Sequence, residues 1–108
     1  MPLTQTQEKT ASLLASLWLR NRPLLEERLG VLDRAASCAA DGTLFEELRE
    51  EAADTAHKLA GSLGMYGYQQ GTEVASKMES IFKSPTPEKL LTLRALSLDL
   101  RKSLADGL

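Results

Sequence analysis

Apolar residues recur at spacings of three and four along most of this chain, and no stretch alternates apolar and polar residues as a strand does. Such spacing gathers the apolar side chains on one face of a helix, and a face of this kind needs another helix to cover it. We therefore expect an all-α fold, an antiparallel up-down four-helix bundle with an additional N-terminal helical segment. At 108 residues, the chain is expected to form one domain over residues 1–108.

The first 40 residues contain two helical patterns with Pro23 between them. Residues 4–19 form the additional N-terminal segment, in which Trp18 is expected to pack as a large apolar plug across one end of the bundle. A proline either opens a helix at its first turn or kinks a continuous one, and we favour a kink or short break over residues 20–22. The first bundle helix then carries one apolar face made of Leu25, Leu29, Leu32, Ala36 and Ala39.

Local signals mark the limits of the other helices. Gly42 is expected to end the first bundle helix, and Thr43 with Glu46 three residues later predicts a capping box for the next one. Thr86, followed by Pro87, predicts the start of the last helix. The central helix is expected over residues 44–63, with a buried face made of Phe45, Leu48, Ala52, Ala56, Leu59 and Leu63. The two helices after it are expected to bury Val74, Ala75, Met78, Ile81 and Phe82, and then Leu90, Leu93, Leu96, Leu100 and Leu104.

His57, the only histidine, lies on the central helix at a spacing of four from Gly61 and seven from Gly64. These three residues form one stripe along the helix, about 140° from the centre of the apolar face at His57. Each glycine inside a helix costs about 1 kcal/mol relative to alanine, so two on one stripe need a reason. We interpret the stripe as a docking surface, where a second protein can approach the imidazole closely.

Around His57 the sequence resembles the histidine-containing phosphotransfer (HPt) domains of two-component and chemotaxis signalling. The motif consists of an alanine before the histidine, an apolar residue two after it, and glycines four, seven and ten after it. Here these positions are Ala56, His57, Leu59, Gly61, Gly64 and Gly67. The run from Gly64 to Tyr68 is similar to the glycine-aromatic exit in phosphotransfer domains of chemotaxis kinases.

The resemblance implies a role for each of these positions. His57 would accept a phosphoryl group from a receiver aspartate or from the ATP-binding domain of a histidine kinase, and pass it to the aspartate of a response regulator. Glu79, which lies 22 residues after His57, would orient the imidazole. The partner would dock at Gly61, Gly64 and Met65, and also at Tyr66 and Tyr68 if these tyrosines are exposed rather than packed at the helix turn.

One position departs from the family pattern. Many members carry a lysine three residues after the histidine, where it can neutralise the phosphoryl group, and this chain has Ala60 there. Three alternatives can supply the charge: Lys58, Lys77 on the next helix, or the partner.

The remaining chemistry is expected to come from the partner. A neutral imidazole keeps one nitrogen lone pair that can attack phosphorus. The sequence has no glycine-rich nucleotide loop and no metal-binding cluster, so we expect no cofactor of its own and Mg²⁺ on the partner receiver or kinase domain. The chain is thus expected to be a phosphoryl carrier rather than an independent catalyst. The alternative is an interaction module that binds a receiver or kinase domain without carrying phosphate.

Composition excludes several other classes of function. The formal net charge is −2 without a basic block, which argues against nucleic acid as a partner. No apolar run is long enough to span a membrane, and the first residues lack the pattern of a signal peptide. The single Cys38 cannot form an intrachain disulfide, and we expect a cytoplasmic protein, monomeric rather than dimeric.

Overall fold

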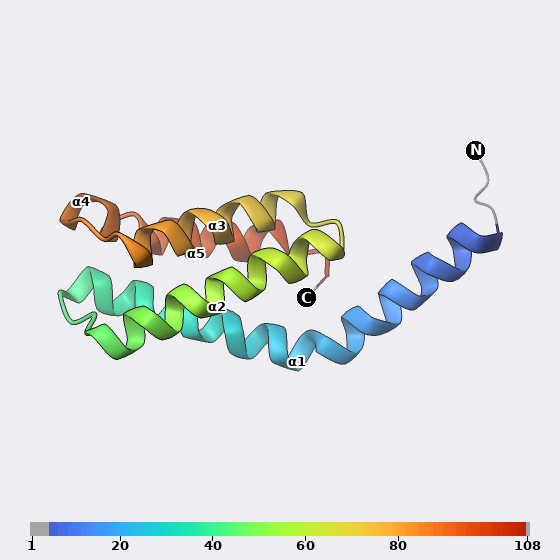
Figure 1. Cartoon of the computed structure of the whole chain (residues 1–108), viewed down its shortest axis with the longest axis horizontal. Coiled ribbons are helices and arrows are strands. Elements are labelled where there is room, and N and C mark those ends of the chain that lie inside the picture. Colours follow the sequence, from blue (N-terminus) through green and yellow to red (C-terminus); the bar gives the residue numbers. More distant parts are fainter. Residues whose placement is uncertain (1–4, 108) are drawn as a thin grey trace.

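The computed structural model describes residues 5–107, and within them the regular structure is entirely helical (Figure 1). The elements are α1 (Gln5–Asp41), α2 (Glu46–Met65), α3 (Gln69–Lys83), α4 (Pro87–Leu90) and α5 (Leu93–Ser103). α2 packs most extensively on α3, while α1 contacts α2 and α5, and α3 also contacts α5. The four longer helices thus close into the expected antiparallel up-down bundle. No helix within the described range is long and apolar enough to cross a membrane.

The additional N-terminal segment is continuous with the first bundle helix. α1 runs unbroken through Pro23, so of the kink or short break predicted over residues 20–22 the structure has no break. Proline lacks an N–H and leaves the carbonyl of Leu19 without its helical partner. Both Leu19 and Pro23 are exposed, so water can satisfy that carbonyl and the helix continues. Figure 1 shows α1 changing direction midway, as the kink alternative implied, with its N-terminal half running out beyond the bundle. The predicted start of this segment, Thr4, lies outside the described residues.

Gly42 ends α1 as predicted, but the capping box after it is wrong. Gly42 has a φ of 73°, and the N–H groups of Gly42 and Thr43 donate to the carbonyls of Ala39 and Cys38 at 3.3 and 2.8 Å. The Thr43 hydroxyl donates to the same Cys38 carbonyl, so it completes α1 instead of starting α2. The N-cap of α2 is Phe45, which makes no side-chain capping hydrogen bond.

The predicted apolar faces form one core. The largest fully buried side chains are Phe82, Leu29, Leu32, Leu59, Leu63, Met78, Leu93, Leu100 and Leu104. Phe45 is an error in the predicted face of α2, because its side chain is 75% exposed. It precedes the helix in an extended conformation, with φ −82° and ψ 165°, so the helical period does not set its direction.

The last predicted helix is divided in two. Thr86 caps α4 as expected, since its hydroxyl oxygen accepts from the Lys89 N–H at 3.2 Å, and Pro87 opens the helix. α4 then ends after one turn, because the Thr92 N–H and hydroxyl both turn back to the Lys89 carbonyl, at 3.0 and 2.6 Å. α5 begins at Leu93 and carries the core leucines that follow.

A polar clamp fixes α5 on α1. Asp33 of α1 accepts from the hydroxyl of Ser97 at 2.5 Å and from Nε of Arg101 at 3.0 Å. Ser97 is only 6% exposed, and the Asp33 carboxylate raises the pKa of Arg101. The clamp satisfies a buried hydroxyl where the two helices meet.

We expect Asp33→Ala to lower the free energy of unfolding by about 1–2 kcal/mol, because it leaves the buried Ser97 hydroxyl without its acceptor and removes a partly exposed ion pair. Urea denaturation followed by circular dichroism measures this loss. The matched control is Asp99→Ala, which removes an exposed carboxylate from α5 and should change stability by less than about 0.5 kcal/mol. Equal effects of the two substitutions would contradict the clamp.

Candidate functional site

The site lies on the seam between α2 and α3, which small side chains keep narrow. Ala53 and Ala56 on α2 and Ala75 on α3 are all buried. Across the seam, the hydroxyl of Thr72 on α3 donates to the carbonyl of Ala60 on α2 at 3.0 Å. Because these residues let the two backbones approach, longer side chains at the edge of the seam can meet across it.

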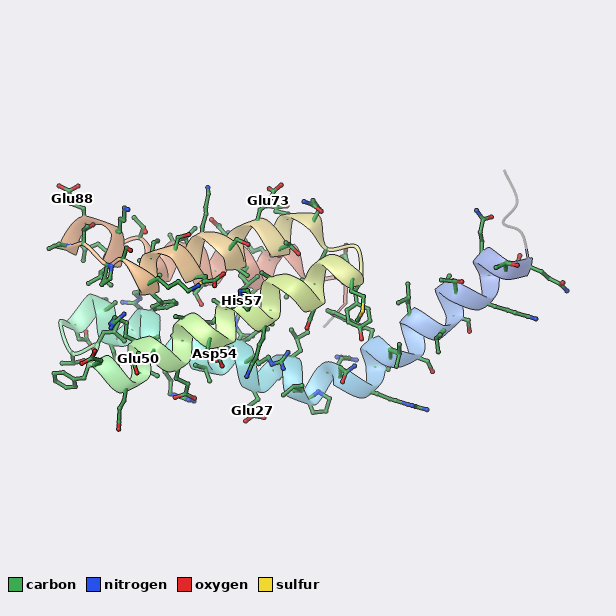
Figure 2. All side chains as sticks on the ribbon, viewed as in Figure 1. Glu27, Glu50, Asp54, His57, Glu73 and Glu88 are labelled. Carbon is green, nitrogen blue, oxygen red and sulfur yellow. The ribbon has the colours of Figure 1, made fainter. Side chains whose placement is uncertain are left out.

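His57 and Glu79 meet across this seam. Nδ1 of His57 lies 3.0 Å from Oε2 of Glu79, with the imidazole 71% exposed and the carboxylate 15% exposed. Figure 2 shows His57 near the middle of α2, on the same helix as Glu50 and Asp54. Because Nδ1 contacts the carboxylate, the second ring nitrogen, Nε2, remains available to react. The imidazole that carries it is accessible to solvent.

Lys83 contacts the same carboxylate oxygen. Its ammonium lies 2.8 Å from Oε2 of Glu79, one turn further along α3. The hydrogen bond from Lys83 is the largest influence that lowers the pKa of Glu79 below its ordinary value of 4.5; partial burial opposes it, and His57 adds to the lowering when its ring is protonated. Glu79 is therefore an ionised acceptor at neutral pH.

These three side chains border an open hollow of about 400 Å³. The hollow is also lined by Arg49, Glu50, Ala53 and Asp54 from α2. Arg49 is held in place there, since NH1 donates to the carbonyl of Phe82 at 2.7 Å and NH2 lies 3.5 Å from Glu46.

The two lysines singled out from the sequence lie elsewhere. The ammonium of Lys58 is 3.0 Å from Asp54, one turn back on α2, and Lys58 does not itself line the hollow. Lys77 is two residues before Glu79 and so lies about 200° around α3 from it. Ala60, at the position of the usual lysine, is half-buried and packs against the core.

The glycine stripe is open to solvent. A Cβ built at Gly61 would meet no atom within 4 Å apart from its own helix, and one built at Gly64 would reach only the Thr72 hydroxyl at 3.4 Å. Beside the stripe, Met65 is 59% exposed. It also borders a hollow of about 210 Å³ between α1 and α2, whose apolar lining includes Leu24 and Leu25. A bare, partly apolar surface therefore continues from His57 to the C-terminal end of α2.

Tyr66 and Tyr68 are half-buried, as in the packed alternative for the helix turn. The ring of Tyr68 stacks on Trp18 at a centroid distance of 4.8 Å, and Tyr66 meets Trp18 edge-on at 5.0 Å. Nε1 of Trp18 donates to the carbonyl of Gly107 at 2.8 Å. Trp18 thus packs across the end of the bundle, as predicted, and holds both tyrosines against it.

Sequence reasoning missed two residues of this site, Lys83 and Arg49. Lys83 follows Glu79 by four residues, a spacing that pairs a glutamate with a lysine on one helix face, so this signal was present in the sequence. Arg49 reaches α3 through a backbone carbonyl, and no sequence pattern indicates such a contact. Within residues 5–107, no group of three or more histidine, cysteine, aspartate or glutamate side chains is placed to hold a metal ion.

The comparison with protein-family models identifies a family. The family model described as "Hpt domain" matches residues 22–106. A curated protein, "Protein RcaC" from Microchaete diplosiphon, is 26% identical over 76 residues, which is 70% of this chain and 12% of that protein. The chain therefore corresponds to about an eighth of the length of this relative. No solved structure matches the chain significantly.

Two helical glycines are expected to respond oppositely to alanine. Gly61→Ala should raise the free energy of unfolding by about 0.5–1 kcal/mol, because the new methyl group enters open space and alanine favours the helix. Gly71→Ala should not raise the free energy of unfolding, because a Cβ at residue 71 would lie 3.1 Å from Leu63 and 3.2 Å from Ser103. Urea denaturation of both variants measures the difference, and an equal gain in both would contradict the open stripe.

Glu79 should make stability depend on pH. Its pKa is lower in the folded chain than in the unfolded chain, so its contribution is fully present above the unfolded value of 4.5 and is lost as pH falls through the folded value. The stability difference between wild type and Glu79→Gln should thus be constant above about pH 5 and shrink below it. Urea titrations at several pH values measure this, with Glu73→Gln, an exposed glutamate of α3, as control. A difference that grows on acidification would contradict the assignment.

Proposed function

The chain belongs to the family of histidine-containing phosphotransfer (Hpt) domains, whose members carry phosphoryl groups in phosphorelays and interact there with receiver and kinase domains. From this premise we propose that His57 is the phosphoryl acceptor of this chain. The donor is a receiver phospho-aspartate or a histidine-kinase ATP domain, and the acceptor is the aspartate of a response regulator.

One observation carries the proposal: the single histidine of the chain is 71% exposed and has Nδ1 on an ionised carboxylate. A hydrogen bond from Nδ1–H to Glu79 selects the tautomer in which Nε2 holds the lone pair. The same hydrogen bond fixes the direction of that lone pair, which is the main contribution a carrier makes to a phosphoryl transfer.

The transfer then needs no proton exchange with solvent. The lone pair of Nε2 forms the N–P bond while the bond between phosphorus and the aspartyl oxygen of the donor breaks, and its electrons remain on the released carboxylate. Nδ1 keeps its proton, so the phosphorylated ring carries a positive charge beside the negative Glu79. Charge stabilisation by Mg²⁺ would have to come from the partner, since the residues described for this site include no metal-binding group.

The docking surface proposed for the partner follows the open stripe. Gly61 and Gly64 let the backbone of a receiver approach α2, and exposed Met65 adds an apolar contact. Tyr66 and Tyr68 are half-buried against Trp18, so we place them at the edge of this surface and not at its centre. On this proposal, the stabilised Gly61→Ala chain transfers phosphate more slowly than wild type.

A second candidate is an interaction module that binds a receiver or kinase domain without accepting phosphate. Ala60 favours it, since the position of the usual lysine has no charge. Binding without labelling separates this candidate from the first.

The test is phosphoryl transfer from a receiver domain charged with labelled acetyl phosphate. We expect label on the wild-type chain that is lost in acid and kept in base, none on His57→Gln, and labelling at least tenfold slower on Glu79→Gln, because the ring loses its orienting charge. Circular dichroism checks that each variant is folded. Label that persists in His57→Gln would refute the assignment, and binding of the receiver without any label on wild type would select the second candidate.

A further inference from the structure

We propose that Lys83 is the cation that this site uses in place of the lysine usually found at the position of Ala60. It acts as a positioning residue: it holds Glu79 against His57 before transfer and moves to the phosphoryl group after it. The inference rests on the proposed function of His57 and deepens it, since it identifies which residue of this chain meets the phosphoryl charge.

Two hydrogen-bond donors share one carboxylate oxygen of Glu79. Nδ1 of His57 and the ammonium of Lys83 lie 3.0 and 2.8 Å from the same Oε2 of Glu79. The ammonium and Nδ1 of the ring therefore meet at the same carboxylate oxygen. The carboxylate is 15% exposed and Lys83 is 63% exposed, so the anion is fixed in the seam while the cation stands on a flexible stem in solvent.

The other cationic side chains near the site are less well placed than Lys83 to meet a phosphoryl group. Lys58 pairs with Asp54 and does not itself line the hollow, and Lys77 lies on the other side of α3 from Glu79. Arg49 lines the hollow, but its guanidinium is held by the Phe82 carbonyl and by Glu46. Among the charged residues that line the hollow, Glu50 and Asp54 are acidic and would repel a phosphoryl group, which leaves Lys83 as the mobile cation beside the ring.

The charges around His57 change when the N–P bond forms. Before transfer, the neutral ring, the carboxylate and the ammonium have no net charge together. After transfer, the ring is cationic and its Nδ1–H becomes a stronger donor to Oε2 of Glu79, while the phosphoryl group brings two negative charges. The ammonium of Lys83 can then leave Oε2 of Glu79 and bind a phosphoryl oxygen. Before transfer, the ion pair with Glu79 therefore keeps this cation close to His57.

The contact can be tested without any phosphoryl donor. Removing the ammonium in Lys83→Gln should raise the pKa of the Glu79 carboxyl towards 4.5, because the hydrogen bond from Lys83 is the main cause of its low value. The titration is followed by NMR of the glutamate side-chain carboxyl carbons. Lys77→Gln is the matched control, since it removes the same charge from the same helix on the far side from Glu79. An unchanged pKa of Glu79 in Lys83→Gln overturns the inference.

The functional test uses phosphoramidate, a small phosphoryl donor that needs no partner protein. We expect Lys83→Gln to be phosphorylated about fivefold more slowly than wild type, as the loss of an exposed ion pair predicts. Lys83→Arg should recover most of the rate, and Lys58→Gln and Lys77→Gln should stay within about twofold of wild type. In protein with ¹³C-labelled lysine, the Cε signal of Lys83 should shift on phosphorylation, whereas those of Lys58 and Lys77 should not.

The outcomes separate the two proposals. Wild-type rates in Lys83→Gln, a loss no larger than in Lys58→Gln, or no rescue by arginine overturn the role of Lys83 and leave His57 as the acceptor. Label on His57→Gln equal to that on wild type overturns the proposed function and, with it, the inference. Slow phosphorylation of Lys83→Gln that is rescued in Lys83→Arg, together with a shift of the Lys83 signal when the wild-type chain is phosphorylated, supports both.

Discussion

The close packing of α2 on α3 is the constraint on which the site depends. Buried alanines and the hydrogen bond from Thr72 to the Ala60 carbonyl bring the two helices together, and only then can a histidine on one reach a glutamate on the other. The same packing bears on where a cation can stand near the site. Residue 60 is half-buried in the seam, where an alanine fits without strain and a lysine would have to bend its ammonium out to water.

Most of the fold could be predicted from spacing alone, because burial imposes the helical period wherever a helix exists. The errors lie at boundaries. Phe45 fits the apolar period of α2 but precedes the helix, and Thr43 looks like a cap for α2 but completes α1. Pro23 permits either a break or a bend, and the local sequence does not decide between them.

The site was less accessible to sequence reasoning than the fold. The glycine stripe predicts an open surface around His57 from local geometry. The pairing of His57 with Glu79 is implied only by the family resemblance, because a spacing of 22 residues across a turn does not determine which side chains meet. Lys83 lies at helical spacing from Glu79, but spacing alone does not show that the pair belongs to the site. Its meaning depends on where Glu79 points, and that is a property of the packed helices.

Trp18 joins three parts of the chain at one end of the bundle: the outer half of α1, the turn between α2 and α3, and the backbone near the C-terminal end. It is also the only tryptophan. Its fluorescence therefore reports on this one junction, separately from the helical signal of the whole bundle. If the outer half of α1 separated from the bundle, the fluorescence of Trp18 would be quenched or shifted to the red while the helical circular dichroism signal stayed the same. Trp18 is thus an intrinsic fluorescent probe of this contact.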